Sequence, residues 1–140
     1  MSESTESRKS LPYRAIPLAQ LQETASCGSA ALPFLLAVKF NYDVNQGGFS
    51  QFVYNMRGNF LAETEEMLKA AGARVAHGFY VRAVSLCLAD TQEYSRFIES
   101  DYRDANAVKE SLQLLSIEYL QQPTDFETEA AEFLASCPRP

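Results

Sequence analysis

The chain has 140 residues, of which 46% are apolar and 21% are charged, and its formal net charge at pH 7 is −6. These values are ordinary for one globular domain that buries most of its apolar surface. They argue against direct nucleic-acid binding, which needs clustered Lys and Arg, and no apolar run approaches the roughly 20 residues of a membrane span.

The three cysteines, Cys27, Cys87 and Cys137, are odd in number and widely spaced, so they predict neither a disulfide framework nor a zinc site. The polar stretch 1–11 predicts a disordered tail and lacks the apolar core of an export signal. We therefore expect one domain over residues 12–140, located in a reducing cytoplasm, with no metal and no cofactor.

Apolar residues recur at helical spacing along this domain, and no useful run has the period of a strand. Pro17 opens a short helix that "CGS" at 27–29 ends. A second helix is expected from about Pro33 into the low 40s. The segment 45–58 follows, and after it comes a helix that Gly72 ends.

The second half of the chain continues the helical pattern. The helix from about Ala73 to Leu88 is apolar over so wide an arc that we expect it at the centre of a bundle. Asp90 with Glu93, and later Thr124 with Glu127, have the spacing of capping boxes at helix starts. The sequence therefore predicts an all-α fold, a single-domain irregular bundle of about six or seven helices.

Little in the sequence indicates catalysis. The one histidine, His77, lies in an apolar stripe, and we interpret it as a packing residue, because general acid–base catalysis needs a cleft and an orienting partner. No nucleophile elbow, phosphate loop or metal-spaced cluster accompanies it. We predict that the protein is not an enzyme. The alternative is a small-ligand or catalytic pocket near Gln51, Asn55 and His77.

The segment "NQGGFSQFVYNMRG", residues 45–58, differs most from the rest of the chain. Gly47 and Gly48 permit a sharp backbone turn, and the apolar residues after them recur at the spacing of a short core helix. We favour a tight joint that leads into this helix. The alternative is a polar rim that meets a partner, formed by Asn45, Gln51, Tyr54 and Asn55.

This segment, followed by a helix ending "LKAAGA", resembles the hallmark of a bacterial family of unassigned function, N-x-GGF-x-Q-[FY]-x-x-N-x-x-G. The resemblance covers roughly residues 30–137. It implies the properties of the family's described member, a dimeric, acidic, all-helical DNA mimic that occupies the DNA-binding surface of a transcription factor. We expect the matching positions to be structural, and they are Asn45, Gly47, Gly48, Phe49, Gln51, Phe52, Asn55 and Gly58.

Mimicry of DNA would depend on surface carboxylates, and residues 81–140 carry eleven acids against five bases. If the segments 90–104 and 118–132 share one face, their combined potential would steer a basic partner. The alternative is that the acids are dispersed and only keep the surface solvated, because a net charge of −6 gives a much lower charge density than that of DNA. The candidate acids are Asp90, Glu93, Glu99, Asp101, Asp104, Glu118, Asp125, Glu127, Glu129 and Glu132.

We therefore predict a non-enzymatic protein-binding domain that neutralises or regulates a partner protein, by acidic DNA mimicry of a DNA-binding regulator. One alternative is an immunity protein against a bacterial toxin. Another is a small-ligand-binding or enzymatic domain of unknown reaction. The expected partner is a basic protein, and the family resemblance implies that the chain also forms a homodimer. We expect neither direct nucleic-acid binding nor membrane association.

Overall fold

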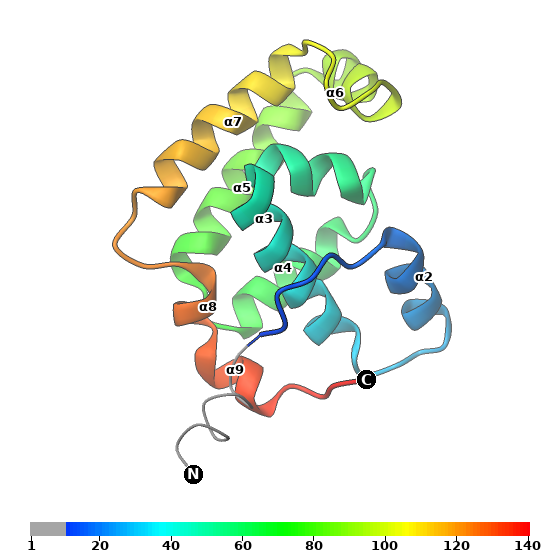
Figure 1. Cartoon of the computed structure of the whole chain (residues 1–140), viewed down its shortest axis with the longest axis vertical. Helices are drawn as coiled ribbons and strands as arrows, with labels where there is room; N and C mark the ends of the chain where they lie inside the picture. The colour runs from blue at the N-terminus through cyan, green and yellow to red at the C-terminus, as the bar shows by residue number, and fades with distance from the viewer. Residues whose placement is uncertain (1–10) are drawn as a thin grey trace.

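The computed structural model describes residues 11–140, which form an all-α bundle without strands, as the sequence predicts (Figure 1). Its helices are α2 (Leu18–Ser26), α3 (Leu32–Met56), α4 (Leu61–Ala70), α5 (Arg74–Ala89), α6 (Thr91–Glu99), α7 (Ala107–Leu120), α8 (Phe126–Glu129) and α9 (Ala131–Ser136). These eight helices exceed the expected six or seven, since the last predicted helix divides at Ala130. The predicted tail lies outside the described residues except for Leu11, which is buried.

The central helix is α3, in which fifteen of twenty-five residues are buried. It packs against α2, α4, α6 and α7. We expected the central position for α5, and that prediction was wrong. Val81 and Leu88, which belong to the wide apolar arc of α5, are 40% and 69% exposed. The rule that a helix with apolar residues on all sides lies at the centre of a bundle therefore holds for α3. Other elements leave part of the apolar surface of α5 uncovered.

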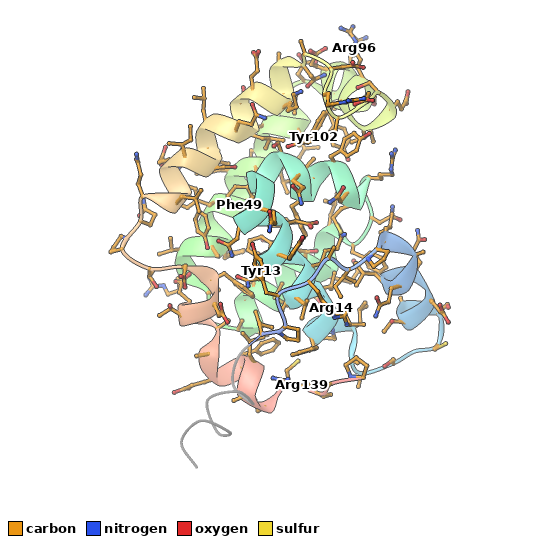
Figure 2. The ribbon with its side chains drawn as sticks, viewed as in Figure 1. Tyr13, Arg14, Phe49, Arg96, Tyr102 and Arg139 are labelled. Carbon is orange, nitrogen blue, oxygen red and sulfur yellow. The ribbon has the colours of Figure 1, made fainter. Side chains whose placement is uncertain are left out.

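An aromatic cluster around Phe40 of α3 forms the middle of the core. Its ring meets Phe49, Phe52, Tyr80 and Phe126 edge-on, with centroid distances from 5.1 to 6.5 Å. Each such pair contributes about 0.5–1.5 kcal/mol beyond its area burial. The cluster joins α3 to α5 and α8, and Figure 2 shows Phe49 at the centre of the bundle.

Helix caps match the sequence prediction at one site and differ at another. The Asp90 side chain accepts a hydrogen bond from Glu93 N at 3.1 Å and caps α6, as expected. At the start of α8 the cap is Asp125, which accepts from Thr128 N at 2.8 Å. The predicted cap, Thr124, lies one residue too early, because Asp is the better N-cap and occupies the adjacent position.

Candidate functional site

The motif segment contains a sharp kink in α3 at Gly48, where φ is 77° and ψ is −171°. Residues other than glycine are essentially excluded from this region of backbone conformation. A Cβ at Gly48 would also lie 2.7 Å from Ser116 Cβ on α7. The kink frees the Phe49 amide, which donates to Ser116 Oγ at 2.7 Å, and Ser116 in turn donates to Leu112 O at 2.8 Å. A serine of α7 therefore replaces the helical hydrogen bond that the kink removes.

Gly47 requires glycine for a different reason. Its backbone is helical, but a Cβ there would lie 2.8 Å from Gln51 Cβ. The Gln51 side chain folds back over this bare backbone and reaches Asp43, where its Nε2 lies 3.5 Å from Oδ1. The glycine pair therefore turns the helix at one residue and makes room for an amide side chain at the other.

Four polar side chains meet around this turn and form the Asp43 cluster, which consists of the buried Lys39 and Asp43 and the half-buried Gln51 and Asn55. Lys39 and Asp43 are 3% and 1% exposed and form an ion pair at 3.4 Å. Asn55 Nδ2 donates to the other carboxylate oxygen at 3.2 Å, and Lys39 donates to Ile16 O. Burial raises the pKa of Asp43, although Lys39 and the two amides act in the opposite direction. The charged carboxylate is costly here and is satisfied by three internal partners.

A shallow cavity of about 250 Å³ adjoins the Asp43 cluster, between α3 and the segment that precedes α2. This segment crosses α3 in Figure 2, and the Tyr13 ring packs against Tyr42 at a centroid distance of 4.8 Å, with the ring planes tilted by 52°. The polar groups in the cavity mainly bond one another. The Asp43 cluster is therefore better suited to fixing the kink and the N-terminal segment than to binding a ligand.

The half of α3 after the kink forms hydrogen bonds with α6 and with the loop that follows α6. Ser50 Oγ lies 2.7 Å from Tyr102 Oη, and Tyr54 Oη donates to Ser100 O at 2.6 Å. Arg57 Nη1 donates to Ile98 O at 2.6 Å. Figure 2 shows Tyr102 between α3 and α6.

The other motif residues also make internal contacts. The exposed Asn45 donates to Asn41 O and Oδ1, Phe49 and Phe52 are buried, and Gly58 adopts φ 79° after α3 ends. All eight motif positions therefore act within one joint. This geometry supports the interpretation of the segment as structural and leaves Tyr54 as an internal contact.

His77 lies at the edge of the bundle. Its ring is 25% exposed, and Nε2 lies 3.0 Å from Glu65 Oε2. This contact lowers the pKa of Glu65. His77 lies on α5 against Glu65 of α4, and the cavity that Gln51 and Asn55 line does not include it.

The ten candidate acids fall at opposite ends of the molecule. Those of 90–104 surround α6, and those of 118–132 surround the end of α7, α8 and α9 (Figure 1). They therefore do not form one face. We call the second group, Glu118, Asp125, Glu127, Glu129 and Glu132, the C-terminal acidic edge.

Many of these carboxylates have internal partners. Glu93 and Asp101, in the α6 group, pair with Arg96 and Arg103. Glu118 pairs with Arg82 of α5, with atoms 2.7 Å apart. Internal bases therefore offset much of the charge of the α6 group.

The remaining partners of the C-terminal acidic edge are mainly backbone amides. Glu129 accepts from Val75 N at 2.8 Å and Ala76 N at 3.1 Å, at the start of α5. Glu127 accepts from Leu11 N at 3.3 Å. The segment 118–132 contains no Lys, Arg or His, and a backbone amide carries no charge that would offset a carboxylate.

Sequence reasoning missed Lys39, Asp43 and Ser116. The i,i+4 spacing of Lys39 and Asp43 inside an apolar helix was an available signal for a buried ion pair. Ser116 had no local signal, because a lone serine in the apolar stripe of α7 has the same pattern whether or not it caps a distant kink.

The fold and the joint define a class of small all-α domain with a kinked central helix and an acidic segment, residues 118–132, that contains no Lys, Arg or His. The chain belongs to the family of DMP19-like proteins, whose family model matches residues 29–137. The curated proteins and the solved structures contain no significant match. None of the helices described here is long and apolar enough to cross a membrane. Within residues 11–140, no group of three His, Cys, Asp or Glu side chains is placed to hold a metal ion.

Proposed function

We propose that this chain is a non-enzymatic protein-binding domain that regulates or neutralises a basic partner through its C-terminal acidic edge. The observation that carries the proposal is the absence of bases from residues 118–132, where five carboxylates lie. The α6 group is the weaker candidate, because Arg96 and Arg103 already pair with its acids.

Membership in the DMP19-like family supports a DNA-binding regulator as the partner, because the family's described member is a DNA mimic. DNA presents one charge per ~1.7 Å of its axis, and four carboxylates within residues 125–132 give a short array of fixed negative charges. Such an array steers a basic surface and raises its association rate.

The proposal is tested by recovering partners from the native host with the intact chain as bait. We expect a stoichiometric DNA-binding protein that its own DNA displaces in competition. Its association rate should also fall steeply as salt rises past ~0.15 M, where the Debye length is about 8 Å. Recovery of a toxin would favour the immunity function instead. Association that does not depend on salt would contradict recognition through carboxylates.

The homodimer implied by the family resemblance would require an uncovered apolar surface, and α7 offers one. Leu114, Ile117 and Leu120 are 69%, 55% and 57% exposed. We propose that a second copy covers them. Ile117→Glu should then convert the dimer to a monomer in size-exclusion chromatography with light scattering. A wild-type chain that is monomeric at high concentration would contradict this.

A further inference from the structure

A cavity of about 290 Å³ opens between the C-terminal half of α3, the turn at 57–60, α5 and α6. Its walls include Phe52, Met56, Tyr80, Val84, Cys87 and Tyr94. None of its thirteen lining residues is charged. Its size is close to the lower limit of about 300–1,000 Å³ for small-molecule sites, which are likewise mostly apolar.

The mouth of this cavity is apolar as well. Leu61 and Leu88 line it and are 46% and 69% exposed. A shallower hollow continues past them along α5 to Val81, which is 40% exposed, and Glu65 is the one charged residue in its lining. Apolar side chains that are this exposed around a concave site indicate a surface that is covered when a ligand binds.

Three hydroxyl groups of the lining, those of Thr91, Tyr94 and Ser95, make no hydrogen bond within residues 11–140, and Tyr94 is the least exposed of these residues. The Tyr80 hydroxyl already donates to Leu61 O at 2.9 Å. The Tyr94 hydroxyl makes no hydrogen bond in the part of the chain that the structure describes. It faces the motif glycine Gly58, where a Cβ would lie 3.2 Å from Tyr94 Oη.

The turn that carries Gly58 holds strained backbone. Among residues 11–140, Arg57 and Phe60 are the non-glycine residues with positive φ, 50° and 59°. Strain of this kind clusters at ligand-binding sites, where the surrounding structure imposes it. Here the bond from Arg57 to Ile98 O holds the turn against α6, at the wall of the cavity.

We propose that this cavity binds an uncharged, mainly apolar small molecule whose single polar group bonds Tyr94 Oη. Charge complementarity decides the class of ligand: the lining offers no counterion, and apolar walls penalise a buried charge. Burial raises the pKa of the Cys87 thiol to about 11, so it stays protonated and acts as an apolar contact. This binding activity goes beyond the proposed recognition of a basic protein and does not depend on it.

The test uses N-phenyl-1-naphthylamine, a neutral apolar fluorophore with one N–H donor, titrated into the intact chain. We expect saturable fluorescence enhancement. Val84→Phe, which fills the cavity, should weaken binding by about tenfold or more, and Tyr94→Phe by about fivefold, the loss of one hydrogen bond. Gln22→Phe adds the same kind of ring at an exposed position of α2, outside both the cavity and the proposed dimer surface, and should bind like the wild type.

Leu88→Asp is a second test variant, and it changes an exposed residue instead of a core residue. Leu88 is exposed, so this change should leave the fold intact, and a charge at the mouth should weaken probe binding. The absence of saturable binding by the wild type would overturn the proposal, as would Val84→Phe and Leu88→Asp variants that bind normally. A second copy of the chain that covers the mouth of the cavity would also overturn the proposal. In that case probe binding per chain would fall as protein concentration rises, and Leu88→Asp would increase probe binding.

Discussion

Replacement of Gly48 by alanine tests the joint most sharply. The backbone at φ 77° and ψ −171° costs a residue with a side chain about 1–3 kcal/mol. The new Cβ would also displace Ser116, whose Oγ holds the Phe49 amide, and an unsatisfied buried amide costs about 1–3 kcal/mol. We therefore expect a loss of about 3 kcal/mol, which lowers the melting temperature of a domain of this size by roughly 10 °C.

Two other glycines separate these contributions when their alanine variants are melted alongside. Gly72 has φ 69° but no atom within 4 Å of its added Cβ, so Gly72→Ala should cost only the backbone part, about 1 kcal/mol. Gly78 lies in α5 with open space around it, and Gly78→Ala should stabilise by about 0.5–1 kcal/mol. A Gly48→Ala variant that melts within about 2 °C of the wild type would refute the reasoning.

Three further predictions concern charged and polar side chains. Asp43→Asn leaves the buried Lys39 charge without its counterion and should cost about 3–5 kcal/mol in urea unfolding, whereas an unchanged midpoint would show that the ion pair is dispensable. The bonds from Arg82 lower the pKa of Glu118, so their stabilising effect is present at neutral pH and is lost as pH falls through the lowered value. Glu118→Gln should therefore lose less melting temperature than the wild type between about pH 5 and pH 3, and an equal loss would contradict this. His77→Gln should change the melting temperature by less than about 2 °C and leave partner binding intact, because the contact with Glu65 lies at the surface. A folded variant that loses an activity would instead support the enzyme hypothesis.

Local signals in the sequence located several helix boundaries, but the helix expected to end in the low 40s continues through a kink at Gly48 to Met56 as α3. The spacing of Asp90 and Glu93 located the start of α6, and Gly72, with φ 69°, lies just after α4 as expected. Periodicity shows which side of a helix is apolar, but not whether another element covers it. The exposure of Val81 and Leu88 on α5 could not be predicted for that reason.

The contacts that define the joint were beyond sequence reasoning, because they join distant parts of the chain. The amide freed by Gly48 is bound by Ser116, sixty-seven residues from Phe49. The Asp43 cluster depends on the N-terminal segment, whose Ile16 carbonyl accepts from Lys39. The separation of the acids at opposite ends likewise follows from the path of α7, which no local pattern encodes (Figure 1).

The central claim is that the C-terminal acidic edge recognises the partner, and the location of charge tests it most directly. Glu127→Lys with Glu132→Lys reverses two carboxylates of this edge and spares Glu129, which caps α5. Glu99→Lys with Asp104→Lys gives the same net charge at the α6 end, on side chains that make no hydrogen bond or ion pair within residues 11–140. Stopped-flow association with the recovered partner should be slowed about tenfold or more by the first pair and less than about twofold by the second. Equal slowing by both pairs would mean that only net charge matters, and no slowing by either would exclude carboxylates from recognition.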